Sequence, residues 1–298
     1  MNADATLVCA FAVLSARPAG AEPHAHPGHD GGGPLRVLPA GDLFLLVQDV
    51  PAAGFGEAAL AQRLERPDEL ERVARAHHRA VETAARWGPA VPLPLATLYL
   101  TDDTAVRAVV EREAELAALL DRLRGRTEWA VKVHAATAAT TSPPSDAGIR
   151  HNGDAGIRNN GTENDGTGTD RGVAGRAYLR RVSARRRTRQ EEHEQALAEA
   201  RAVDRELRRH AVAATRHRPQ SSELTGKDAP QLLNGAYLVD DADRAAFTGA
   251  LERLTAAGRL RGVEVVASGP WVPYSFARLD EQRQCAERDP EQQREVGA

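Results

Sequence analysis

The chain has 298 residues, of which 42% are hydrophobic and 27% are charged. This length suits about two domains, and the hydrophobic content suffices for buried cores, so a wholly disordered or fibrous protein is excluded. The chain carries 39 basic and 42 acidic residues, a formal net charge of −3. Such a balance gives no overall attraction to nucleic acid or to an anionic membrane, so we expect neither as a partner unless a local patch binds it.

The cysteines and the hydropathy of the chain limit the compartments in which the protein is expected. Cys9 and Cys285 lie far apart without a CxxC pair, which supports neither a disulfide framework nor a cysteine zinc site and fits a reducing, cytoplasmic setting. No window approaches the ~20 consecutive apolar residues that span a bilayer. The apolar run 7–14 and the following Ala19 to Ala21 allow two interpretations, a buried first strand or a signal peptide. Asp4 and the absence of Lys or Arg before the run favour the strand.

The first half of the chain predicts a mixture of strands and helices. Apolar runs, turn residues and helical spacing give the order of elements. We expect a strand at 7–14, a hairpin from 35–38 and 43–47, helices over 57–86 with a break at Pro67, a strand at 95–100, a helix at 103–124 and a strand at 127–134.

The second half begins with a Gly-rich, polar stretch, residues 135–170, which contains a tandem octad at 146–161. Such a composition cannot bury enough apolar area to offset the entropy of ordering, so it predicts a flexible linker. After it we expect a long helix at 174–212 and a strand at 235–239. A helix capped by Asp240 or Asp241 should follow and run to Ala257, and a last strand should lie at 263–266.

Two groups of histidines are candidates for chemistry. His24, His26, His29 and Asp30 could ligate a transition metal, although a solvated His-rich loop is the simpler interpretation. The pair His77 and His78, near Glu82 on a predicted helix, lacks a third catalytic member in the sequence, so packing or exposure is the default.

The basic cluster Arg180 to Arg189 could bind phosphate, as a nucleic-acid-binding regulator would require. No aromatic residue is interleaved after Tyr178, and acidic residues follow at once, so a solvated helix face is the better interpretation. The sequence has no Gly-rich phosphate loop and no Gly-x-Ser-x-Gly, which disfavours an enzyme.

Aromatic residues are scarce, yet three of twelve fall within residues 269–276, Gly-Pro-Trp-Val-Pro-Tyr-Ser-Phe. Two prolines there prevent a helix or a central strand, so these rings should project from an extended segment. They either fold back onto the second domain or form an exposed apolar patch. We expect Trp271 to pack against the second domain and fix the C-terminal tail. Trp129, by contrast, alternates with valines and is expected in a core.

Several segments together resemble the gas vesicle protein L/F family (GvpL/GvpF). The matching segments occur in the family's order along nearly the whole chain: 7–14, 92–99, 125–133, 175–179, 235–239 and 269–276. The resemblance marks these residues as family motif or structural positions: Trp129, Lys132, Gly175, Arg176, Tyr178, Leu179, Tyr237, Gly269, Pro270, Trp271, Pro273, Tyr274 and Phe276. One departure is Pro94-Leu95-Ala96, where the family usually has Arg-Phe-Gly.

The resemblance implies an α+β fold of two small α+β domains, the N-terminal one ferredoxin-like, with a long helix between or beside them. We place an N-terminal domain at 1–134, a linker at 135–172, a C-terminal domain at 173–276 and a tail at 277–298. It also implies a non-catalytic role without cofactor, in which the protein binds the hydrophobic shell protein GvpA and other gas vesicle proteins, as an assembly factor or a minor shell component. The rival hypotheses are a metal enzyme using His24, His26 and His29, and a nucleic-acid-binding regulator.

Overall fold

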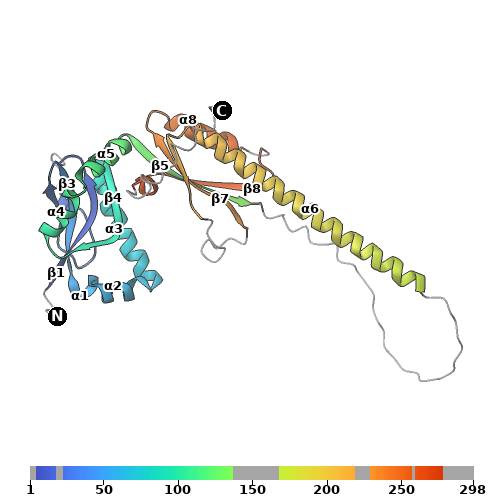
Figure 1. Cartoon of the computed structure of the whole chain (residues 1–298), viewed down its shortest axis with the longest axis horizontal. Helices are drawn as coiled ribbons and strands as arrows, with labels where there is room; N and C mark the ends of the chain where they lie inside the picture. The colour runs from blue at the N-terminus through green and yellow to red at the C-terminus, as the bar shows by residue number, and fades with distance from the viewer. Residues whose placement is uncertain (1–4, 18–22, 137–167, 219–228, 257–258, 278–298) are drawn as a thin grey trace, which may run out of the picture.

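The computed structural model describes residues 5–17, 23–136, 168–218, 229–256 and 259–277, except for the side chains of 168–179 and 181. Figure 1 shows two lobes side by side, with one long helix projecting from the second. The octad repeat and most of the predicted linker and tail lie outside these residues. Residues 168–172, which we assigned to the linker, belong to helix α6.

The first lobe is a four-stranded antiparallel sheet with the order β2-β3-β1-β4. Its strands are β1 (Thr6–Leu14), β2 (Leu35–Ala40), β3 (Leu43–Pro51) and β4 (Ala90–Tyr99). A short 3-10 turn η1 (Pro23–Ala25) precedes the hairpin, and the helices are α1 (Ala52–Phe55), α2 (Glu57–Leu64), α3 (Pro67–Trp87), α4 (Asp102–Val110) and α5 (Glu113–Leu123). Strand β1 is thus the predicted buried strand, and Pro67 begins α3 as expected.

Both faces of the first sheet are buried. Side chains of alternating direction along β1 enter two different cores, one with Phe55, Leu60 and residues of α3, the other with residues of α4 and α5. Residues 8–14 are consequently all buried, which explains why their sequence is a continuous apolar run and does not alternate.

The second lobe is also a four-stranded antiparallel sheet, ordered β6-β7-β5-β8. It consists of β5 (Arg126–Ala135), α6 (Gly168–Arg208), β6 (Ala213–Arg216), β7 (Gln231–Asp240), α8 (Arg244–Thr255), β8 (Val263–Trp271) and the 3-10 turn η2 (Tyr274–Phe276). Helices α6 and α8 pack on one face, around a core with Val131, Tyr237 and Phe247. Ala236 and Leu238, on the other face, join the core of the first lobe.

The α+β class with two small units is confirmed, and two details differ from expectation. Strand β5, which our boundary at residue 134 put in the first domain, pairs with β7 and β8 in the second sheet. All strand pairs of the first sheet are antiparallel, and the order β2-β3-β1-β4 is that of a ferredoxin-like sheet, as expected for the N-terminal domain. The helix predicted at 103–124 is divided, because Arg112 has non-helical dihedral angles, φ −120 and ψ 19.

Strands β4 and β8 extend through prolines that we expected to interrupt them. Both are edge strands, where a missing N–H donor removes no ladder hydrogen bond on the open side. In β4, residues 93–96 bulge out between the partners of Ala10 and Ala12. Ala96 in this bulge has φ 66, a left-handed conformation that favours glycine.

Candidate functional site at the domain junction

The closing segment, residues 269–276, runs between the two lobes. Phe276 is only 6% exposed and lies in the core that α4, α5 and the first sheet share with Ala236 and Leu238. Val272 and Tyr274 pack against the core on the other side of the first sheet. The segment therefore does not fold back onto the second domain alone, as one of our interpretations had it, because its apolar side chains are buried against the first.

Polar contacts fasten the same segment to the second sheet. The carboxylate of Glu128, in β5, accepts hydrogen bonds from the backbone N–H of Ser275 at 2.8 Å and from its hydroxyl at 2.6 Å. The ring of His217 lies with Nε2 3.0 Å from the same hydroxyl. Burial raises the pKa of Glu128, although the hydrogen bonds from Ser275 oppose this shift. Since the hydroxyl is a donor to Glu128, its role here is to attach η2 to the sheet.

An aromatic cluster on helix α3 completes the junction. His78 lies with its ring centroid 5.9 Å from that of Trp271 and 5.8 Å from that of Tyr274, whose hydroxyl is 3.3 Å from His78 Nδ1. Trp271 is 41% exposed, and its indole N–H donates to Ser268 Oγ at 3.2 Å. Our expectation that Trp271 is the buried residue fixing the chain end is wrong. Phe276 occupies the buried position, while Trp271 leaves part of its ring at the surface.

Gly269 is needed where β8 passes Trp129. Its φ is 149, and a Cβ would approach the carbonyl oxygen of Glu128 to 2.9 Å and the ring of Trp129 to 3.0 Å. Trp129 packs against Phe247 of α8 with ring centroids 5.6 Å apart. The glycine thus lets the strand lie on the indole, and the core position predicted for Trp129 agrees with this packing.

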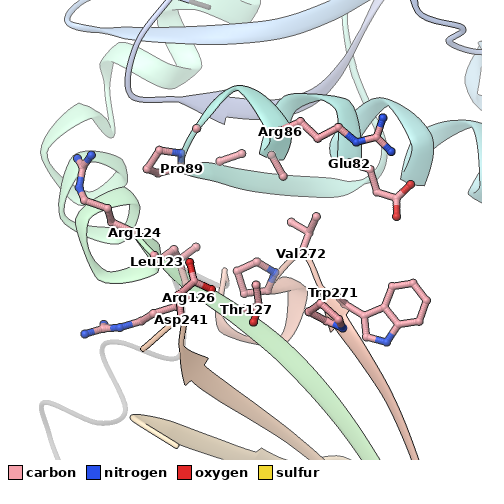
Figure 2. A pocket seen from close by; sticks show the side chains of 16 residues that line it. Glu82, Arg86, Pro89, Leu123, Arg124, Arg126, Thr127, Asp241, Trp271 and Val272 are labelled. Carbon is pink, nitrogen blue, oxygen red and sulfur yellow. The ribbon is translucent and has the colours of Figure 1, made fainter. Parts of the chain in front are cut away.

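A cleft of about 460 Å³ opens between the lobes beside this segment. Its walls come from the end of α3 and the start of β4 on one side and from the start of β5 and the end of β8 on the other. Figure 2 shows Val272 pointing toward α3, with the indole of Trp271 at the edge of the cleft and Arg86 and Glu82 on the opposite wall. Binding sites between domains commonly have this size and position.

The remaining predicted positions lie away from the cleft. Tyr237 is fully buried and donates its hydroxyl to Asp204 of α6 at 2.7 Å. Burial tends to raise the pKa of Asp204, but hydrogen bonds from Arg216, Tyr237 and Arg208 outweigh this and lower it. Lys132 lies on the face of β5 opposite the helices, next to Val266 of β8. Gly175, Arg176, Tyr178 and Leu179 belong to α6, and their side chains lie outside the description.

The His-rich loop is not assembled for metal binding. His29 is 5% exposed between Phe11 and Phe55, and burial lowers its pKa to about 4. His26 instead meets the ring of Trp87. Across the described ranges, no group of three or more His, Cys, Asp and Glu is placed to hold a metal ion. The structure thus contradicts a ligand set that includes His29, because that imidazole belongs to the core.

Sequence reasoning missed Glu128, Ser275 and His78 as junction residues. Glu128 is 147 positions from Ser275, and no local pattern reports a contact of that separation. One signal was present in the sequence, because His78 and Glu82 were predicted as neighbours on a helix. His78 Nε2 lies 3.3 Å from Glu82 Oε1.

None of the described helices is both long and apolar enough to cross a bilayer.

Together these features define a two-domain, antiparallel α+β protein whose closing segment joins the lobes beside a cleft and an exposed tryptophan. Comparison with known proteins identifies the family. The family model described as gas vesicle synthesis protein GvpL/GvpF matches residues 9–278, and the chain belongs to that family. A curated relative, gas vesicle protein L of Streptomyces sp. (strain CB03234), is 37% identical over 253 residues, 85% of this chain and 86% of the relative.

Two solved structures have the same fold. The crystal structure of GvpF from Anabaena sp. PCC7120 covers 92% of this chain and 96% of its own, with a TM-score of 0.56 and 14% identity. That of GvpF from Microcystis aeruginosa covers 91% and 99%, with a TM-score of 0.54 and 16% identity. The family places the protein in gas vesicle assembly, among other gas vesicle proteins.

Proposed function

We propose that the protein binds the hydrophobic shell protein GvpA and covers its apolar surface until the subunit joins the growing vesicle. In this proposal the protein acts in the cytoplasm and at the gas vesicle, without catalysis, as an assembly factor or minor shell component. A shell that polymerises through apolar surfaces needs such a partner, because exposed apolar patches associate indiscriminately in water. Membership of the GvpL/GvpF family is the observation that carries the proposal.

The domain junction is the surface that we propose for this contact. Trp271 is 41% exposed at the edge of the 460 Å³ cleft, and tryptophans in such positions dominate many protein interfaces. Pro270, Val272 and Pro273 add apolar walls. A partner side chain that entered the cleft would be removed from water on both sides, which favours an apolar shell subunit over a charged one.

Co-purification with GvpA tests the proposal. Tagged full-length chain should retain GvpA, and Trp271→Ala should reduce the retained amount about tenfold while thermal stability changes little, since a partly exposed ring contributes less than a buried one. Val110→Ala is the matched control, because this side chain is 43% exposed on α4 and does not line the cleft.

One outcome would contradict the binding of GvpA, and another would contradict only the choice of the junction as the binding surface. If wild-type chain fails to retain GvpA under conditions in which vesicles form, and vesicles still form after deletion of the gene, binding of GvpA is refuted. If wild-type chain retains GvpA and Trp271→Ala retains it equally, the contact exists but the junction is not its surface.

A further inference from the structure

The middle of helix α6 carries a run of described side chains that do not pack against either lobe. The whole helix spans Gly168–Arg208, yet among its described side chains, those of 180 and 182–208, the buried apolar ones begin at Ala196 and continue with Ala200, Val203 and Leu207. In the arm, defined here as residues 180–195, every side chain that the structure describes is exposed. At 1.5 Å per residue the arm extends about 24 Å, and Figure 1 shows it standing away from both lobes.

The arm is basic on the face that would continue the buried stripe. Counting back from Ala196 by three or four residues gives His193 and Glu192, then Arg189, then Arg186 and Arg185, then Val182. The face that is apolar against the second sheet is therefore occupied mainly by arginines further toward the N-terminus, with Glu192 as the one acidic member among these positions. A polar, exposed helix usually depends on many ion pairs along its own surface.

Such pairs are scarce in the arm. Among the described side chains, Arg180, Arg185, Arg186, Arg187 and Arg189 have no carboxylate within ion-pair distance, whereas Gln190 donates to Glu194 at 2.8 Å. Arg185 and Arg189 are four residues apart, and like charges at that spacing destabilise a helix. The arginines thus destabilise the helix, and a partner carrying negative charge would remove that cost.

We propose that the arm is a docking surface for an acidic protein surface, separate from the junction and independent of which face binds the shell protein. Charge complementarity favours this partner over the other polyanions. Glu191, Glu192 and Glu194 follow the arginines within one turn, and they would repel a continuous phosphate backbone. The arm has no aromatic residue to stack on bases. It also lacks the apolar face with which amphipathic helices enter a membrane surface.

Binding of fluorescent poly-L-glutamate to the full-length chain tests the proposal. Wild-type protein should bind it, and about tenfold more weakly when salt is raised from 50 to 300 mM, because screening shortens the range of the charges. The variant Arg185→Gln, Arg186→Gln, Arg189→Gln should lose about tenfold in affinity at low salt. Glutamine is a good helix former, so circular dichroism should show the helix retained.

A charge-matched control is Arg107→Gln, Arg122→Gln, Arg253→Gln, three exposed arginines on other helices, which should bind poly-L-glutamate as wild type does. Equal losses in the two triple variants would overturn the proposal. So would tighter binding of duplex DNA, or of vesicles of anionic lipid, than of poly-L-glutamate. The arm variant should still retain GvpA, so failure here is distinguishable from failure at the junction.

Discussion

The two sheets have the same strand order and the same antiparallel pairing, yet they are used differently. The first sheet is covered on both faces, and its central strand β1 is buried from residue 8 to residue 14. The second has helices on one face only, while its other face meets the first domain at Ala236 and Leu238 and is open around Val266. The same strand order thus forms a sheet buried on both faces in the first domain and a sheet with one partly exposed face in the second.

The two domains also differ in their buried titratable groups. The largest predicted effect is therefore that acid lowers the stability of the first domain more than that of the second. His29 and His77 are buried in the first domain, each against the ring of Phe11, and burial lowers the pKa of each to about 4. A depressed histidine pKa means that their contribution to stability is complete above the unfolded value of 6.5 and is lost as pH falls toward 4. The loss amounts to roughly 3 kcal/mol per histidine.

Groups of the second domain act at other pH values or in the opposite direction. The lowered pKa of Asp204 costs stability only as pH falls through values below 3.8. The raised pKa of Glu128 favours the folded state as pH falls toward 4.5 from above. Amide hydrogen exchange followed separately in the two sheets at pH 7 and pH 4.5 should show the first domain losing far more stability than the second. His77→Gln should flatten this dependence, and equal losses in both domains would contradict the assignment.

Truncation of Phe276 at the junction should uncouple the two domains, which is the second-largest expected effect. Phe276→Ala removes a buried ring from the shared core, which typically costs about 3–5 kcal/mol. We expect the melting transition to fall and to divide into two, because the lobes lose their common contact. A single, unshifted transition would mean that Phe276 does not join the domains.

The open and covered faces of the second sheet can be compared with one substitution at two positions. Val133→Ala, on the helix-covered face and fully buried, should cost about 2 kcal/mol of unfolding free energy. Val266→Ala, on the open face and 40% exposed, should change it by less than about 0.5 kcal/mol. Denaturant unfolding measures both, and similar costs would show that the second face is covered in solution.

The smallest effect is expected in the edge bulge of the first sheet. Ala96 has a left-handed backbone at φ 66, a conformation that costs a residue with a Cβ about 1–2 kcal/mol, and Ala96→Gly removes this cost. The flexibility of glycine in the unfolded chain offsets about 0.5–1 kcal/mol of that gain. A net gain of about 0.5 kcal/mol should appear in denaturant unfolding, with Ala108→Gly in α4 as a control that loses stability. Destabilisation by Ala96→Gly would contradict the strain.

Local pattern was enough to predict most of the elements, although strand β6 was not among them. The continuous apolar run at 7–14 gave a buried strand, and the alternation from Trp129 to Val133 gave a half-buried one. Family motifs gave the correct class of fold. The break at Arg112 and the extension of β4 and β8 through prolines depended on packing and on edge position, which a local pattern does not report.

The chain's own sequence determined which segment is unusual, residues 269–276, because aromatic residues are scarce elsewhere and two prolines stiffen it. Only the tertiary structure decided what each ring does: Phe276 is buried in a core built from both domains, and Trp271 remains partly exposed on His78. The physical reason is distance along the chain. The partners of this segment, Glu128 and His78, are 147 and 196 positions from Ser275 and Tyr274, so only the packing of two complete domains brings them together.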